Sequence, residues 1–423
     1  MAGTNRSFWV VAVLVLVVAG LAAGYGLRAR YESNRGVGMP SSLFAVRTGS
    51  DQAGADIFIG DGTAAEYFDR VLRLLQEEFV DPIDDEAPLA RGALRSLFQW
   101  LRDPGTRYYN PDEWSAYLNV YEGKFSGIGA DVTVLRGGTE ERIYLPLTVV
   151  SVADGGPAAE AGLKAGDIIE GIDGRWVASW YLLDEWDDAN LRLGRGEITA
   201  EELEQIRSGI QDRVERMSPL SDALEALVRE SAGEVLLRIN RDGEQSEIAV
   251  ERRPHSVEPV EETAEGIRIR SFGSGAAQRL RAALEGKDEV TLDLRGNPGG
   301  SLETVERCLS LLIPAGEYAR VQREPGEKPA PLRLEEGTDR RLRIKVMVDR
   351  GTAREAELFV AALRDRGGAE IVGGRTFGLG LKVERFALSD GGGYTITSGR
   401  FYDLEGRSLF EDRAEPDAEG EPQ

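Results

Sequence analysis

Apolar residues recur with a helical period in the first third of the chain and with a strand-like period after it. In residues 66–80 and 89–102 they follow the spacing of an amphipathic helix, and Pro104 ends the second run. From residue 122 short alternating runs are separated by glycine-rich turns, which is typical of strands. From residue 257 strands alternate with helices. The chain is therefore predicted to have an α/β fold (α+β overall) in which helices cover a mixed sheet.

The N-terminus carries an uncharged apolar run of 20 residues, Phe8–Leu27, shortly after Arg6. A run of this length is sufficient to cross a bilayer as a helix. It lacks a clear cleavage site of small residues, so residues 1–30 are predicted to form an uncleaved signal anchor with one transmembrane helix. Residues 31–62 are rich in Gly, Ser and charge and are predicted to be a tether.

The composition excludes several classes of function. The net charge of −22 argues against nucleic acid as a partner, because no basic surface is expected to neutralise phosphates. The single histidine, His255, and the single cysteine, Cys308, form no cluster of metal ligands, so we expect no metal site and no cofactor. A general base of the lysine type has few candidates, namely Lys124, Lys164, Lys287, Lys328, Lys345 and Lys382.

A strand, a tight turn and a helix follow one another in the last third of the chain. Residues 344–348 alternate as in a strand, the chain turns at Gly351, and the apolar spacing after it predicts a helix. A second strand and a glycine-rich loop, 373–380, close the unit. The first residues of the helix expose free backbone N–H groups at the positive end of its dipole, which favours a nucleophile or an anion. This turn is the predicted place for catalysis.

The turn reads G-T-A-R-E-A-E in residues 351–357, and the loop reads T-F-G-L-G in residues 376–380. Both closely resemble the carboxyl-terminal processing (tail-specific) proteases, whose turn reads roughly G-[ST]-A-S-A-S-E and whose loop reads T-F-G-K-G. The resemblance implies a serine-type peptidase fold with a Ser nucleophile and a Lys base. Here Arg354 stands at the position of the nucleophile and Leu379 at that of the base. Arginine stays protonated and leucine transfers no proton, so the chain is predicted to be a degenerate member, a pseudoenzyme without the dyad.

Further segments carry the same resemblance in the same order. Leu292–Gly300, L-D-L-R-G-N-P-G-G, resembles a family turn whose glycines, here Gly299 and Gly300, offer backbone N–H groups to an oxyanion. Asp103–Trp114 and the closing stretch of the chain are similar to two other family segments. The resemblance covers about 350 residues and implies a tail-specific-protease-like α/β core domain.

Residues 122–177 resemble a PDZ domain. Glu122–Val134, E-G-K-F-S-G-I-G-A-D-V-T-V, resembles the loop and strand that receive a peptide C-terminus, and Val149–Val177 matches the PDZ pattern of short helix, glycine turns and strand. The resemblance implies that backbone N–H groups bind the terminal carboxylate while the peptide adds as a strand. The implied peptide-binding residues are Phe125, Ser126, Gly127, Ile128, Gly129 and Ala130.

A charged stretch with a helical pattern, about 180–217, interrupts the predicted PDZ domain. Thr199 followed by Glu202 is a capping-box arrangement and predicts a helix start within this stretch. The predicted order is a signal anchor (1–30), a tether (31–62), a helical N-terminal segment (63–121), the PDZ domain with its insertion (122–254), the protease-like α/β domain (255–413) and a disordered tail (414–423).

The leading hypothesis is a membrane-anchored, non-catalytic homologue of these proteases that binds peptide or protein C-termini through its PDZ domain. The alternative is an active serine- or threonine-type endopeptidase that cleaves C-terminal regions of extracytoplasmic proteins, with Thr352 as relocated nucleophile and Lys382 as relocated base. A third hypothesis makes Arg354 an anion or carboxylate clamp at the helix N-terminus. Glu355 is expected to pair with Arg354 or to repel a developing oxyanion, which favours loss over relocation. The resemblance implies a single-pass protein of the bacterial inner membrane with its body in the periplasm, and oligomer formation stays open.

Overall fold

The computed structural model describes residues 64–81, 83–101, 103–135, 137–138, 143–144, 146–177, 181–229, 233–410 and 418–419. The chain divides into two compact units, Met1–Glu86 and Ala87–Gln423. The described helix of the first unit, α2 (Ala64–Glu78), exposes apolar side chains such as Phe68 and Leu75. The predicted anchor, Phe8–Leu27, and the tether lie outside the described residues, and none of the described helices is long and apolar enough to cross a membrane.

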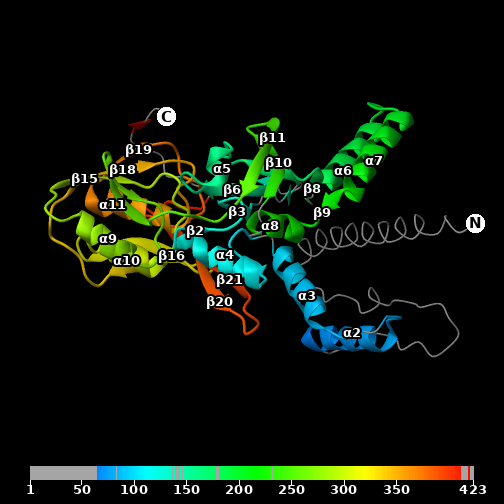
Figure 1. Cartoon of the computed structure of the whole chain (residues 1–423), viewed down its shortest axis with the longest axis horizontal. Helices are drawn as coiled ribbons and strands as arrows, with labels where there is room; N and C mark the ends of the chain where they lie inside the picture. The colour runs from blue at the N-terminus through cyan, green and yellow to red at the C-terminus, as the bar shows by residue number, and fades with distance from the viewer. Residues whose placement is uncertain are drawn as a thin grey trace, which may run out of the picture. The chain divides into compact units, whose positions relative to one another are not determined.

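Three elements precede the first large sheet of the second unit (Figure 1): α3 (Ala87–Trp100), β1 (Arg107–Tyr109) and α4 (Pro111–Tyr121). Helix α4 begins with a reciprocal cap, in which Glu113 N–H donates to the Asn110 side chain and Asn110 N–H donates to the Glu113 carboxylate. The same carboxylate is buried and lies 3.0 Å from Arg95 of α3, so it ties the two helices together. The helical pattern did not predict β1, because three residues are too few to show a period.

A sheet of seven strands forms the predicted PDZ domain. Its strands are β3 (Ala130–Val134), β6 (Leu147–Val152), β7 (Ile168–Ile172), β8 (Arg175–Val177), β9 (Met217–Ser218), β10 (Gly233–Arg241) and β11 (Glu244–Arg252). The main path runs β11-β10-β7-β6-β3, so β3 lies at an edge. The apolar side chains of this sheet, of α5 (Pro157–Glu160) and of α8 (Leu220–Val228) form one core around Val149, Leu237 and Ile239.

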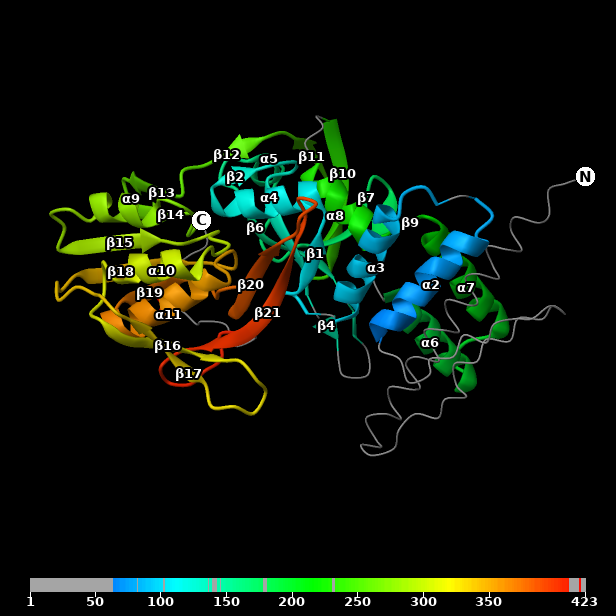
Figure 2. The ribbon, with the colours of Figure 1, turned by 90° about the horizontal axis from the view of Figure 1, so that it is seen from below.

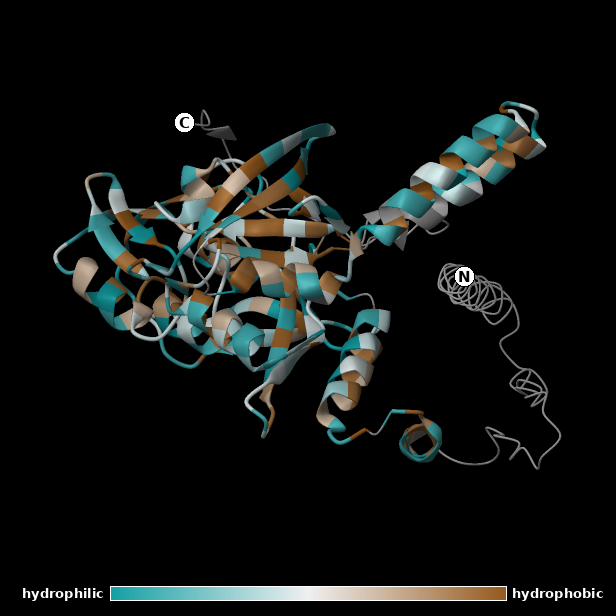
Figure 3. Cartoon of the chain, turned by 45° about the vertical axis from the view of Figure 1, so that its right-hand side comes forward, coloured by the Kyte–Doolittle hydropathy of each residue, from teal (hydrophilic) through white to brown (hydrophobic). Residues whose placement is uncertain are grey.

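Shorter elements surround this sheet. The strands β2 (Lys124–Phe125) and β12 (His255–Ser256) pair with each other, as do β4 (Gly137–Gly138) and β5 (Ile143–Tyr144). The insertion consists of α6 (Tyr181–Gly194) and α7 (Ala200–Glu215), which pack against each other and project as an arm (Figure 3). The predicted capping box is confirmed, because Glu202 N–H donates to Thr199 Oγ1 at 3.2 Å and Thr199 N–H donates to Glu202 Oε2 at 2.7 Å.

A second sheet, of six strands, carries the candidate site. Its order is β13 (Val260–Thr263), β14 (Gly266–Ile269), β15 (Glu289–Asp293), β18 (Arg343–Val348), β19 (Glu370–Gly373) and β22 (Ala418–Glu419), and all but β13 pair in parallel. Helices α9 (Ala276–Ala283), α10 (Leu302–Leu309) and α11 (Glu355–Gly367) share its core. Within that core the rings of Phe272 and Phe359 lie 4.8 Å apart. The mixed α/β fold predicted from the sequence is confirmed.

A third sheet joins the beginning and the end of the second unit. Its order is β1, β21 (Gly393–Tyr402), β16 (Gly316–Gln322) and β17 (Ala330–Leu334), and β20 (Leu381–Ala387) pairs with β21. Figure 2 shows the β20–β21 hairpin beside β1 and α4, and the register places Arg107 opposite Thr395. The elements before the PDZ sheet therefore belong structurally with the last domain.

Candidate functional site

Strand β18 leads into α11 through a sharp turn that ends at Arg354. This residue has φ 54° and ψ −123°, a conformation that costs a non-glycine residue on the order of 1–3 kcal/mol. The half-buried carboxylate of Asp349 holds the turn, because it accepts hydrogen bonds from the N–H groups of Gly296 at 2.8 Å and Gly351 at 2.9 Å. Strained strand-to-helix turns expose the nucleophile in many hydrolases. Residue 354 therefore has a backbone suited to a nucleophile but carries the side chain of arginine.

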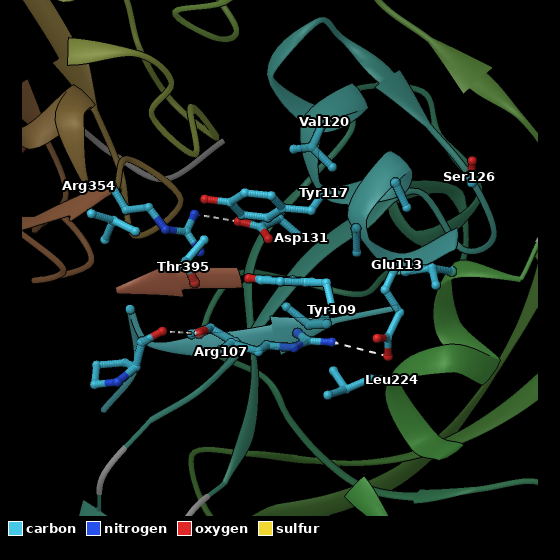
Figure 4. A pocket seen from close by; sticks show the side chains of 18 of the residues that line it. Arg107, Tyr109, Glu113, Tyr117, Val120, Ser126, Asp131, Leu224, Arg354 and Thr395 are labelled. Carbon is cyan, nitrogen blue, oxygen red and sulfur yellow. Dashed lines mark hydrogen bonds and ion pairs between the residues drawn. The ribbon is translucent and has the colours of Figure 1, made fainter. Parts of the chain in front are cut away.

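The Arg354 side chain crosses to the PDZ domain. Its Nη1 donates to Asp131 Oδ2 on β3 at 2.5 Å and to Pro298 O at 3.0 Å (Figure 4). Both side chains of the ion pair are largely buried, with 13% and 11% of their surface exposed. Burial lowers the pKa of the Arg354 guanidinium, whereas the negative charge of Asp131 raises it. The second effect is part of a larger upward shift, so the pKa lies above its ordinary value. Arg354 is therefore a permanent cation in a charge-assisted contact between two domains.

The predicted oxyanion turn keeps its shape, but its donors are occupied. Gly299 N–H donates to Asn297 Oδ1 at 2.8 Å, and Gly300 N–H donates to Glu355 Oε2 at 3.2 Å. Glu355 is 2% exposed. Because the Glu355 carboxylate occupies the Gly300 N–H, it would repel an oxyanion that bound to the same donor. Of the two roles expected for Glu355, pairing with Arg354 is not found among the described contacts, where Arg354 pairs with Asp131 instead.

Leu379, at the position of the family base, is part of a small apolar cluster. Only 4% of its surface is exposed, and the other buried members are Val150, Ala353, Phe377 and Leu381. Val150 belongs to β6 of the PDZ sheet, whereas Ala353 immediately precedes Arg354. The place of the base is thus an apolar contact between the PDZ domain and the strained turn, where a lysine ammonium would lose its hydration.

Glu357 connects the turn to the loop that carries Leu379. Its buried carboxylate accepts hydrogen bonds from Arg354 N–H (3.0 Å) and from the loop donors Thr376 Oγ1, Gly378 N–H and Leu379 N–H (2.7 Å each). Burial raises the pKa of Glu357 to about 7, and these four donors act in the opposite direction. Sequence reasoning missed this residue. The available signal was its place three residues after Arg354, where a glutamate can return to the backbone at the helix start.

The two relocation candidates have other partners. Thr352 is fully buried, and its hydroxyl donates to Leu294 O at 2.8 Å. Lys382 Nζ pairs with Glu384 and lies 3.4 Å from Ser398 Oγ. In the part of the chain that the structure describes, no hydrogen bond joins Thr352 to Lys382. A dyad built from these two residues is not assembled in this geometry.

Arg385 of β20 ties α4 to the oxyanion turn. Its Nη2 donates to Gly300 O at 2.9 Å, and its Nε donates to the hydroxyl of Tyr117 at 3.2 Å. The guanidinium also lies 4.9 Å from the ring centre of Tyr121, within the range of a cation–π contact. Helix α4 is therefore held directly against the candidate site.

The predicted peptide-binding residues run from the end of β2 to the start of β3. Phe125 and Ile128 are buried, and Ile128 N–H donates to Leu227 O at the end of α8 at 3.0 Å. Gly129 N–H reaches Ser126 O only at 3.5 Å, so this amide is the more readily available donor for a carboxylate. Ala130 starts β3, the strand at the edge of the sheet. The structure thus places the loop where a strand would add, while Ile128 serves the core.

A cavity adjoins this edge and reaches Arg354 (Figure 4). The volume of the cavity is about 60 Å³, which is enough for a few water molecules. Its lining includes Ala130, Asp131 and Val132 of β3, Leu224 and Val228 of α8, Arg107 and Tyr109 of β1, Glu113 and Tyr117 of α4, and Arg354. The predicted peptide groove and the predicted nucleophile position therefore share one cavity.

Comparison with known proteins agrees with this geometry. Residues 266–419 match the model of peptidase family S41, and residues 148–181 match that of the PDZ domain. The chain is 27% identical over 348 residues to the chloroplastic C-terminal processing peptidase of Tetradesmus obliquus (81% of this chain, 70% of the relative). It is 28% identical over 334 residues to the carboxyl-terminal-processing protease of Synechocystis sp. (78% and 70%). The solved photosystem II D1 C-terminal processing protease has a similar fold, with a TM-score of 0.58 and 23% identity over 84% of this chain and 87% of that one.

Replacing Glu357 with Gln is expected to reduce the free energy of unfolding by about 2–4 kcal/mol. One oxygen becomes an NH₂ group that faces N–H donors, so buried donors lose their acceptor at about 1–3 kcal/mol each. Chemical denaturation of Glu357→Gln measures this loss. The control is Glu303→Gln, whose carboxylate is 72% exposed and pairs with Arg307, so its effect should stay within about 0.5 kcal/mol. Equal stability of the two variants would contradict the role of Glu357.

Removing Asp131 alone is expected to be worse than removing the whole ion pair. Asp131→Ala leaves the Arg354 cation buried without its partner, at a cost of about 3–5 kcal/mol. Asp131→Ala combined with Arg354→Met should be more stable than the sum of the single effects allows. Denaturation of the four proteins in this cycle measures the coupling, and strictly additive effects would rule out a coupled buried pair.

Proposed function

Because residues 266–419 of this chain belong to peptidase family S41 and residues 148–181 to the PDZ domains, we propose that the protein is a catalytically inactive homologue of the carboxyl-terminal processing proteases, which binds peptide or protein C-termini through its PDZ domain. One observation carries this proposal: the strained position that suits a nucleophile holds Arg354 in a buried ion pair with Asp131. A guanidinium has no lone pair available to attack a carbonyl.

Two further features support inactivity. Leu379 places an apolar side chain at the position of the base, within a buried cluster. Glu355 places a carboxylate on the N–H of Gly300, where an active site would stabilise an oxyanion. Nucleophile, base and oxyanion donors act together in acyl transfer, so the loss of all three leaves no partial route.

Peptide binding is supported by the edge of the PDZ sheet. Strand β3 ends the main path of the sheet, and the cavity adjoins it between α8 and α4. An extended peptide can therefore add as a strand, with main-chain hydrogen bonds for affinity and pockets for selectivity.

The alternative function is a working endopeptidase with Thr352 and Lys382 as its reactive pair. The retained turn geometry at Arg354 favours it, since the fold still presents a side chain at the start of α11. The buried hydroxyl of Thr352, which donates to Leu294 O, favours the non-catalytic function instead.

We further propose that Phe8–Leu27 anchors the protein in a bacterial inner membrane with its body in the periplasm. The length and apolar character of this segment support the anchor. Fractionation tests it: the full chain should remain with membranes after alkaline carbonate extraction, whereas a chain lacking residues 1–30 should be released.

The full chain in detergent is expected to bind, but not to cleave, an unstructured peptide with an apolar C-terminus. Mass spectrometry of the incubated peptide and fluorescence anisotropy measure the two properties. Thr352→Ala is expected to leave both unchanged. Cleavage that disappears in Thr352→Ala would support the relocated dyad and overturn the proposal.

Restoring the dyad alone is expected to be insufficient for activity. In Arg354→Ser with Leu379→Lys, the Glu355 carboxylate still accepts the Gly300 N–H, so we expect no turnover above background. Adding Glu355→Ala frees this donor and is expected to give measurable cleavage of the same peptide. Turnover by the double variant equal to that of the triple variant would show that Glu355 does not block the site.

A further inference from the structure

The cavity beside β3 has two chemically different walls. The apolar wall consists of Ala130, Val132, Leu224 and Val228. The polar wall includes Arg107, Tyr109, Glu113, Tyr117, Asp131 and Arg354. The rings of Tyr109 and Tyr117 lie 4.8 Å apart in this wall, and in Figure 4 their hydroxyl groups point to the side of Arg354 and Thr395.

Successive side chains of β3 point in turn to the apolar wall and to the polar wall. Ala130 and Val132 pack against the core of the PDZ domain, whereas Asp131 binds Arg354 and Thr133 donates to Pro104 O at 3.1 Å. A peptide that adds as a strand to the edge of β3 follows the same alternation, because successive side chains of a strand point to opposite faces. Its side chains must therefore meet the apolar wall and the polar wall in turn.

The loop before β3 fixes the direction of such a peptide. The available amide of Gly129 precedes β3, and Ile128 N–H bonds to the end of α8, so the carboxylate-binding end of the groove lies at the start of β3. A peptide with its C-terminus there runs antiparallel to β3. Its last side chain lies next to Val228 and Leu224, and its penultimate side chain then faces the polar wall.

The polar wall contains two guanidinium groups, those of Arg107 and Arg354. The Glu113 carboxylate is shared by two guanidinium groups, with Arg95 at 3.0 Å and Arg107 at 3.6 Å. Arg107 lies over the ring of Tyr109, 4.6 Å from its centre. Both hydrogen bonds that the structure records for the Arg354 side chain use Nη1. Each guanidinium has five N–H donors and these contacts do not use all of them, so Arg107 and Arg354 retain N–H groups for another acceptor.

We propose that this groove selects peptide C-termini with an apolar last residue and an acidic penultimate residue, which Arg107 and Arg354 bind. This inference rests on the proposed binding of C-termini by the PDZ domain. It makes Arg354 a specificity-determining residue at a position that elsewhere carries a nucleophile. A basic penultimate side chain is rejected, because it would bury a cation next to two guanidinium groups.

Binding of labelled peptides to the full chain in detergent tests this inference. The probes are fluorescein-labelled octapeptides that end in Glu-Leu, Gln-Leu or Lys-Leu, and a Glu-Leu peptide with an amidated C-terminus. We expect Glu-Leu to bind at least about tenfold tighter than Lys-Leu, which corresponds to about 1.4 kcal/mol, with Gln-Leu between them. Arg107→Gln and Arg354→Gln should each reduce this ratio to below about threefold, because each removes one charge from the polar wall.

Arg238→Gln is the matched control. Arg238 is a PDZ arginine on β10 that pairs with Glu247 outside the cavity, so its loss should leave the ratio unchanged. Thermal unfolding checks that each variant is folded, and Arg107→Gln decides the test by itself if Arg354→Gln is unfolded. A free C-terminus that binds without discrimination between Glu and Lys overturns this inference alone. Equal binding of the amidated peptide overturns the proposed recognition of C-termini as well.

Discussion

The buried carboxylate of Glu357 is the interaction on which the geometry of the site depends. Carboxylates are tolerated inside a protein when donors match their lone pairs, and this one accepts four hydrogen bonds. One donor is the backbone of the strained residue Arg354, and the other three belong to the loop 376–379. None of these bonds involves the side chain of residue 354 or 379. The turn and the loop are therefore held in place with an arginine at residue 354 and a leucine at residue 379.

The two exchanged side chains are part of the packing between domains. The sequence suggested Glu355 as a partner of Arg354, but in the fold Arg354 pairs with Asp131 of the PDZ sheet. Leu379 packs in the cluster that includes Val150 of the same sheet. An ion pair of this burial contributes more to a defined geometry than to stability, because desolvation offsets most of the Coulomb attraction. Residues 354 and 379 thus both take part in the contact between the PDZ domain and the protease-like domain.

The sequence predicted features that depend on local constraints. The capping box at Thr199 and the glycine turns of the PDZ pattern are examples, since their physical causes lie within a few residues. The contacts that define the site are distant in sequence. Arg354 and Asp131 are 223 positions apart, and Glu355 and Gly300 are 55 apart. No period or motif encodes such a pair, so the sequence identified which residues are exceptional at the site but not what they contact.

The retained glycine turn is explained by packing without reference to catalysis. A Cβ at Gly300 would lie 2.4 Å from Phe272 O, and Gly299 has φ 102°. The Asn297 side chain is fully buried and donates to Ile269 O at 2.8 Å, while it accepts the Gly299 N–H. Substitutions in this turn would disturb the sheet whether or not an oxyanion ever forms. Its presence is therefore evidence for the fold, whereas evidence about activity must come from the side chains at the start of α11.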